Sequence, residues 1–122
     1  MKIQKLLLNG KAVGKTAVAD NFFLRLRGMI GRNFDNFDAM IFIPCNGVHT
    51  FFMRYAIDVI YLNRERYVTA FFECVPKGHV LPVKMKTEMV IEMPAGNICK
   101  YGIKYRDCLR AVCVSNLQYN CK

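Results

Sequence analysis

The chain has 122 residues, of which 53% are hydrophobic and 22% charged, and its formal net charge is +9. This length fits one domain that can bury a core without metal or disulfide support, and the composition excludes a disordered chain. No stretch approaches the roughly 18 consecutive apolar residues of a spanning helix, so we expect residues 1–122 to form a single domain without a membrane span.

The basic excess comes from 18 Lys and Arg residues against 9 Asp and Glu residues. These basic residues are spread along the whole chain and never form a run of five. A soluble charged surface is therefore favoured over a nucleic-acid patch. The excess still suits an anionic ligand or an acidic protein segment as the partner, and nucleic acid is the less favoured choice.

The cysteine pattern predicts a reduced, cytoplasmic protein. None of the six cysteines forms a CxxC pair, and their spacing resembles no disulfide scaffold. The opening segment MKIQKLLLNG holds only three consecutive leucines, so we expect no signal peptide. Most of the thiols are expected to be buried as small hydrophobic groups. The cysteines are Cys45, Cys74, Cys99, Cys108, Cys113 and Cys121.

The first third of the chain predicts a hairpin followed by a short helix. Residues 2–19 read as two strands, because the Asn-Gly pair at positions 9 and 10 is a favoured two-residue turn. The Asp-Asn pair after the second strand can cap a helix over residues 22–31. Two glycines inside that segment weaken the helix and favour its early end.

From residue 39 onward, the pattern is typical of one strand after another, with turn residues at intervals of about ten. A helical turn or two is expected over residues 95–102, and the polar tail, residues 115–122, is expected to be loosely ordered. The sequence therefore predicts a mainly β domain: a small barrel or strongly curved, antiparallel-rich sheet of six to eight strands with one or two short helices. The expected later strands are residues 39–43, 48–53, 57–62, 66–75, 89–93 and 108–114.

Five motifs occur in a specific order along the chain. They are RLRGMIGR (25–32), MIFIPC (40–45), VHTFFMRYAIDVIYL (48–62), VIEMPAG (90–96) and GIxxxD (102–107). In this order the chain resembles the domain of unknown function 192 family of small bacterial and archaeal proteins, over about residues 12–112. The resemblance implies a compact, strongly curved β-sheet or small barrel with one or two short helices, and no established activity.

The motif residues that this resemblance carries over are Arg25, Gly28, Met29, Arg32, Pro44, Cys45, His49, Thr50, Met53, Ile57, Asp58, Val59, Glu92, Pro94, Gly96 and Asp107. The chain departs from the family pattern at two positions. Asn63 stands where an acidic residue is frequent, and Arg106 stands where glycine is usual, which puts the shape of that turn in question. Neither departure touches the long middle motif.

Cys45 and His49 form the first candidate constellation, four positions apart in the segment CNGVHTFFM. A catalytic thiol needs a base within hydrogen-bond reach and a third group that orients the imidazole. Asp58 or Glu92 would serve as that third group, so the candidates for catalysis are Cys45, His49 and Asp58. The same three residues could instead supply sulfur, nitrogen and oxygen ligands to zinc.

Neither chemistry has its usual signature here, since there is no strand-to-helix elbow and no ordinary metal-ligand spacing. The favoured interpretation is structural: His49 is a half-buried strand residue bonded to backbone or to a carboxylate, with Cys45 packed beside it. We therefore expect no bound metal and no cofactor.

Asp58 and Glu92 are acidic residues inside apolar strands, where a carboxylate either faces solvent or needs a partner. Simple alternation places Asp58 on the outer face of its strand. We expect Asp58 to pair with an arginine of residues 25–32 and so to hold the helix against the sheet.

The function predicted from the sequence is a non-enzymatic binding or accessory module with a cleft for an anionic ligand or an acidic partner segment. The alternative is a hydrolase or transferase that uses Cys45 and His49. The residues expected to bind the ligand are Arg25, Arg32, His49, Thr50, Met53, Asp58 and Glu92.

Overall fold

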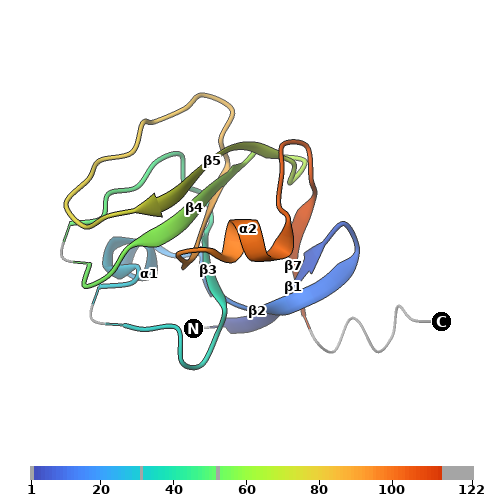
Figure 1. Ribbon diagram of the computed structural model, residues 1–122, viewed down its shortest axis with the longest axis horizontal. Helices are drawn as coiled ribbons and strands as arrows, with labels where there is room; N and C mark the ends of the chain where they lie inside the picture. The colour runs from blue at the N-terminus through green and yellow to red at the C-terminus, as the bar shows by residue number, and fades with distance from the viewer. Residues whose placement is uncertain (1, 31, 52, 114–122) are drawn as a thin grey trace.

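The computed structural model describes residues 2–30, 32–51 and 53–113 and shows one strongly curved seven-stranded sheet with two short helices (Figure 1). The predicted fold class, mainly β with a curved, antiparallel-rich sheet, is confirmed. The elements in chain order are β1 (Lys2–Leu8), β2 (Lys11–Ala19), α1 (Phe22–Arg27), β3 (Ala39–Phe42), β4 (Ile57–Leu62), β5 (Val68–Val75), β6 (Met89–Pro94), α2 (Asn97–Tyr101) and β7 (Leu109–Val112).

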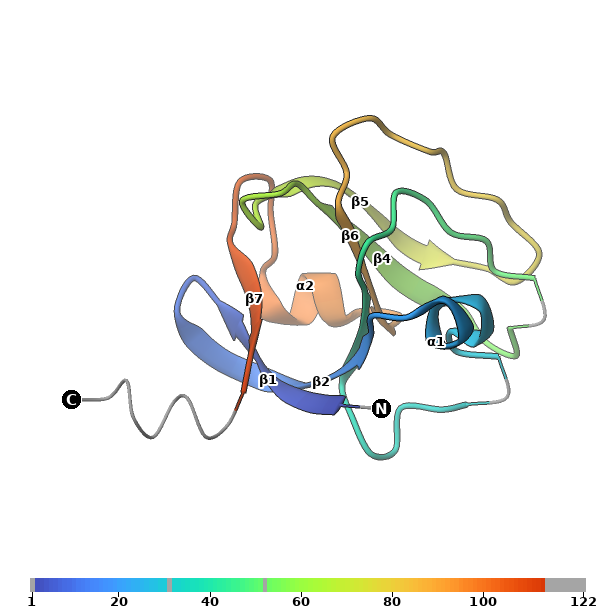
Figure 2. The same cartoon turned by 180° about the vertical axis from the view of Figure 1, so that it is seen from behind.

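The sheet has the strand order β5-β4-β6-β3-β2-β1-β7. The pair β2 and β3 is parallel, and the other neighbouring pairs are antiparallel. The curvature brings the first and last strands of this order together at one end, where the segment before β7 lies beside the start of β5 (Figure 2). Here the Val68 amide donates to the Asp107 carbonyl at 2.8 Å, and the Leu109 amide donates to the Arg66 carbonyl at 3.0 Å.

Two hydrophobic clusters form the core, one on each face of the sheet. Successive strand residues point to opposite faces, so β6 contributes Val90 to one cluster and Ile91 and Met93 to the other. Leu24 of α1 packs against the first cluster, and Ile98 of α2 belongs to the second. Each helix therefore covers a different face of the central strands.

The local predictions for the first third of the chain are largely confirmed. The turn between β1 and β2 uses Asn9 and Gly10 at φ 49° and 86°, as an Asn-Gly turn requires. Asn21 caps α1, because its Oδ1 accepts a hydrogen bond from the Leu24 amide at 2.9 Å. The helix is shorter than predicted and ends at Arg27, since Gly28 takes a φ of 52° that stops the helical path.

The predicted strand over residues 48–53 is wrong. Within its described part the segment forms turns and one isolated bridge, between His49 and Val80. Thr50 explains the difference, because its hydroxyl donates to the Pro76 carbonyl at 2.7 Å and accepts from the His79 amide at 2.9 Å. These bonds tie the segment to the loop between β5 and β6 in place of a regular ladder.

The predicted tail, residues 115–122, and the last residues of the strand expected over 108–114 lie outside the described residues. In the part of the chain that the structure describes, no helix is long and apolar enough to cross a membrane.

Candidate functional site

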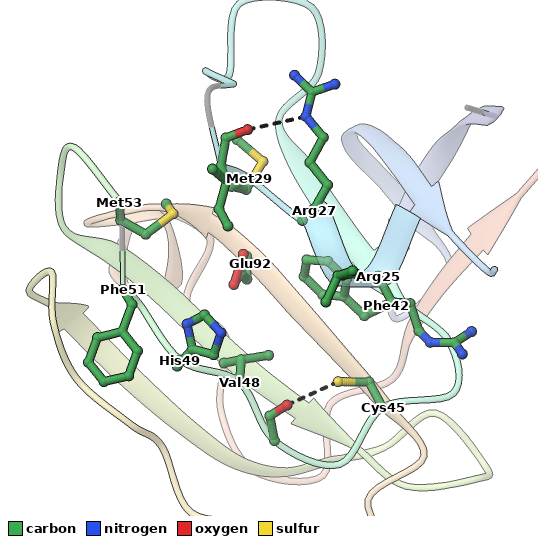
Figure 3. Close-up of a pocket in the computed structure, with 14 residues that line it drawn as sticks. Arg25, Arg27, Met29, Phe42, Cys45, Val48, His49, Phe51, Met53 and Glu92 are labelled. Carbon is green, nitrogen blue, oxygen red and sulfur yellow. Dashed lines mark hydrogen bonds between the residues drawn. The ribbon is translucent and has the colours of Figure 1, made fainter. Parts of the chain in front are cut away.

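A pocket of about 160 Å³ opens between the end of α1 and the loop of residues 45–53 (Figure 3). Its floor is formed by β6 and β3, which lie side by side in the sheet. The side chains that line it are mainly apolar, with a few ionisable groups among them. The lining includes Arg25, Arg27, Gly28, Met29, Phe42, Cys45, Val48, His49, Phe51, Met53 and Glu92.

Glu92 lies at the centre of this ring of side chains (Figure 3) and is only 4% exposed. Its strand neighbours in the sheet are Met40 and Val59, which offer no polar side chain. No described residue donates a hydrogen bond to its carboxyl group, and no described side-chain oxygen or nitrogen is both fully buried and unpaired. The Glu92 oxygens therefore meet the pocket, and burial raises the pKa of this carboxyl to about 8.

Cys45 and His49 line the same pocket but do not form a reactive pair in this geometry. The Cys45 thiol donates to the Gly47 carbonyl at 3.2 Å, and burial raises its pKa, with the Glu92 charge acting in the same direction. His49 is exposed, contrary to the half-buried position expected, and its ring lies 5.1 Å from that of Phe51. No hydrogen bond joins Cys45 to His49 in the described part of the chain, so nothing there favours a thiolate.

The arginines of α1 line the pocket with their stems and turn their charges outward. Arg25 Nη1 donates to the Ile43 carbonyl at 3.3 Å, and Arg27 Nε donates to the Ile30 carbonyl at 3.3 Å. In Figure 3 both guanidinium groups point away from Glu92. Positive charge is therefore held at the mouth of the pocket, while the floor carries the carboxyl group.

Asp58 lies outside this pocket, and its predicted arginine partner is wrong. Asp58 is completely buried and accepts hydrogen bonds from the amides of Cys74, Gly96 and Ile98 at 2.8, 3.1 and 2.8 Å. Alternation does place it on the opposite face from Glu92, but α2 covers that face. The amides at the start of α2 lack helical partners and use the carboxylate as their acceptor.

The pocket thus gathers Arg25, Cys45, His49, Met53 and Glu92 from the predicted residues, while Arg32, Thr50 and Asp58 lie outside its lining. Thr50 is fully buried and ties two loops together, as described above. Burial and the charge of Arg27 lower the pKa of Arg32. The sequence analysis missed Arg27, Phe42 and Phe51 as lining residues, and no spacing rule on a six-residue helix would single out Arg27.

Neither a metal cluster nor buried cysteines occur among the described residues. No three His, Cys, Asp or Glu side chains gather closely enough there to hold a metal ion. The expectation that most cysteines are buried is wrong, because Cys74, Cys99 and Cys113 are exposed while Cys45 and Cys108 are only partly covered. These cysteines lie on short elements and loops, Cys99 on α2 and Cys74 on β5 among them, and their side chains reach the surface.

The fold and the pocket together define a domain with a strongly curved β-sheet and a cavity of side-chain size beside a short helix. The chain belongs to the DUF192 family, described as "Uncharacterized ACR, COG1430", with residues 5–111 matched. The resemblance drawn from its motifs is thereby confirmed.

Two curated relatives are UPF0127 proteins from Thermococcus. The protein from Thermococcus sibiricus is 32% identical over 90 residues, which cover 70% of this chain and 58% of the relative. The protein TK1120 from Thermococcus kodakarensis is 35% identical over 92 residues, which cover 70% of this chain and 57% of the relative. The chain therefore spans less than two thirds of the length of these relatives.

Two solved structures share the fold. A protein of unknown function from Novosphingobium aromaticivorans has a TM-score of 0.75 at 20% identity, covering 88% of this chain and 82% of that one. A protein from Sinorhizobium meliloti, proposed to be a transcription regulator, has a TM-score of 0.79 at 15% identity, covering 90% of this chain and 94% of that one. At these identities the likeness concerns the fold alone.

Proposed function

We propose that this chain is a non-enzymatic binding module of the cytoplasm, which holds one group of a ligand or of an acidic partner segment in the pocket beside α1. The observation that carries the proposal is the pocket itself, with apolar walls, arginines at its mouth and, on its floor, a carboxyl group that no described residue pairs. Ligand sites are usually concave and mostly apolar with a few polar groups that fix orientation.

The size of the pocket sets what it can hold. Its volume of about 160 Å³ is close to the roughly 150 Å³ of an engineered cavity that accepts benzene. The pocket therefore suits one side chain or a small molecule of similar size. Larger parts of a ligand would lie outside, near Arg25 and Arg27.

The charge distribution favours an anionic group at the mouth. Arg25 and Arg27 hold their guanidinium groups outside the floor, and the whole chain carries a net charge of +9. Such a field attracts carboxylates, phosphates or acidic segments and raises their local concentration. The alternative of a Cys45-dependent hydrolase or transferase has less support, because the geometry holds Cys45 as a neutral thiol.

The pocket can be tested by NMR of methyl-labelled methionines. Met29 and Met53 line the pocket, whereas Met85 is 93% exposed and lies outside its lining, so it serves as an internal control. Carboxylate-bearing fragments and short acidic peptides should shift the Met29 and Met53 methyl signals and leave that of Met85 unchanged.

Arg25→Met should weaken this binding about tenfold, as expected for one lost charge-assisted contact. Arg110→Met, which removes an exposed arginine of β7, is the matched control and should leave the affinity unchanged. If no member of the panel moves the two pocket methyl groups, the proposed binding site is wrong.

A further inference from the structure

The floor of the pocket carries an acidic group that no described residue pairs. Glu92 is 4% exposed, and burial alone raises the pKa of its carboxyl group, with no hydrogen bond or charge from a described residue acting on it. An unpaired polar group in an apolar site is costly, and for a carboxyl group the cost falls most heavily on the charged form. Such a group needs either a proton or a partner with positive charge.

None of the elements packed around Glu92 supplies that partner. The neighbouring strands present Met40, Phe42 and Val59 on this face. The ionisable groups that line the pocket from the other elements are Arg25 and Arg27 from α1 and Cys45 and His49 from the loop after β3. Tyr55, further along that loop, lies outside the lining but close enough for the Glu92 charge to raise its pKa, after the larger effect of burial. Both arginines donate to backbone carbonyls, Cys45 donates to Gly47, and the Tyr55 hydroxyl donates to the Arg32 carbonyl at 2.9 Å. The His49 ring lies against that of Phe51, with 5.1 Å between the ring centroids, and makes no ion pair with Glu92 among the described residues.

We propose that the pocket recognises a cationic nitrogen group, a guanidinium or primary ammonium on a short aliphatic stem, whose N–H groups donate to Glu92. This inference rests on the proposed function and names the part of the ligand that enters the pocket. When the cation binds, Glu92 gives its proton to solvent and stays in the complex as a carboxylate. The ion pair then replaces the O–H bond that kept the buried group neutral.

The walls fit the stem of such a ligand. Met29, Met53, Phe42 and Phe51 offer polarizable and aromatic surface, which suits both methylene groups and a cation near a ring face. The outward arginines weaken, without abolishing, the binding of a ligand that carries only positive charge. The ligand therefore combines the cationic head with an anionic group at its outer end, as a zwitterion or a basic side chain within an acidic segment does.

The matched probes are n-propylguanidinium and n-propylurea, which have nearly the same shape and differ in charge. Titrations followed by the Met29 and Met53 methyl signals should give at least tenfold tighter binding of n-propylguanidinium at pH 8. Its affinity should rise about tenfold from pH 7 to pH 9, because binding requires the ionised form of a group whose pKa is about 8. Guanidinium stays charged throughout this range, so the change reports on the protein.

Glu92→Gln should remove both the preference for charge and the pH dependence while leaving the weak binding of n-propylurea. Glu88→Gln, at an exposed site before β6, should change neither. Free arginine and an acetylated Asp-Arg-Asp peptide are then compared. Tighter binding of free arginine indicates a small molecule as the source of the cation, and tighter binding of the peptide indicates a protein segment.

Equal affinity for the two probes, or a pH-independent affinity in the wild-type protein, would overturn the cationic recognition and leave the pocket of the proposed function standing. The same holds if carboxylate fragments shift the pocket methyl groups while n-propylguanidinium does not. Loss of every response, for the carboxylate panel as well as for both probes, would instead refute the proposed function together with this inference.

Discussion

Asp58 and Glu92 lie on the adjacent strands β4 and β6, one register step apart, and point to opposite faces of the sheet. Val59 pairs with Glu92 and Asp58 pairs with Met93, so the two carboxyl groups never share a side. Asp58 accepts three backbone N–H donors within 3.1 Å, whereas Glu92 has no hydrogen-bond donor among the described residues. Asp58 therefore stabilises the fold, whereas the Glu92 carboxyl group is available to a ligand in the pocket.

Asp58→Asn should destabilise the protein by about 2–4 kcal/mol, because an amide cannot accept three N–H donors as a carboxylate does and its own NH₂ group would face a buried amide. Chemical denaturation at pH 7 measures the change in the free energy of unfolding. Asp20→Asn is the matched control, since Asp20 is exposed, and it should change the free energy by less than about 0.5 kcal/mol.

The double variant Asp58→Asn with Arg25→Met tests whether Asp58 binds the start of α2 or forms the arginine ion pair that the sequence predicts. Because Asp58 is bonded to the start of α2 and Arg25 to the Ile43 carbonyl, their effects on stability should add within about 0.5 kcal/mol. A strong coupling between the two substitutions would restore the arginine pair and contradict the geometry.

Glu92 should make the protein less stable as the pH rises from about 5 to about 8. Its pKa is about 8 in the folded protein and 4.5 as an ordinary value, so the folded state holds one more proton than the unfolded state between these limits. The free energy of unfolding therefore falls as that proton leaves. Each unit of difference between the two pKa values corresponds to about 1.4 kcal/mol, so the loss is at most about 5 kcal/mol.

Glu92→Gln, which resembles the protonated acid in shape, should flatten this part of the stability curve, while the control Glu88→Gln should keep it. Melting temperatures from pH 5 to pH 8.5 provide the measurement. A wild-type curve that rises with pH over this window, and is lowered at pH 8 by Glu92→Gln, would show that Glu92 is ionised and paired in the free protein.

The sequence predicts the elements whose causes are local. The Asn9-Gly10 turn, the Asn21 cap and the apolar strands β3 and β4 each follow from residues that are close in the chain. The segment of residues 48–53 does not, because Thr50 is bonded to Pro76 and His79, which lie 26 and 29 positions away. Its β-branched and aromatic residues indicate a strand, and tertiary hydrogen bonds override that preference.

The candidate site was likewise predictable from the sequence only in part. Arg25, Cys45, His49, Met53 and Glu92 belong to the motifs, and the fold brings them to one pocket. The burial of Asp58 could not be predicted, because alternation assigns a strand residue to a face but does not show that a helix forty residues later covers that face. The packing of α2 decides this, and short helices leave little periodicity to read.

Gly28→Ala should lower the free energy of unfolding by about 1–3 kcal/mol. Gly28 has φ 52° and ψ −128°, which strain any L-residue, and an added Cβ would lie 3.3 Å from the Phe42 ring. Gly10→Ala is the matched control, since Gly10 also has positive φ but has open space around it. The difference between the two variants measures the contact with Phe42 together with the backbone strain peculiar to Gly28, and equal losses would mean that neither adds a cost.

Cys45 should react slowly with alkylating reagents and show a thiol pKa above its ordinary value. Burial disfavours the thiolate and the Glu92 charge adds to this effect, and together they outweigh the backbone hydrogen bond at Gly47 and the Arg25 charge, which lower the pKa. The measurement is the iodoacetamide rate against pH in a variant that keeps Cys45 and carries serine at the other five cysteines. A second variant that keeps only the exposed Cys74 provides the reference rate.

His49→Ala should leave the Cys45 rate unchanged, because His49 makes no hydrogen bond to the thiol in the described structure. A thiolate that titrates well below about pH 7 and depends on His49 would contradict this prediction and favour the alternative of a hydrolase or transferase that uses Cys45 and His49.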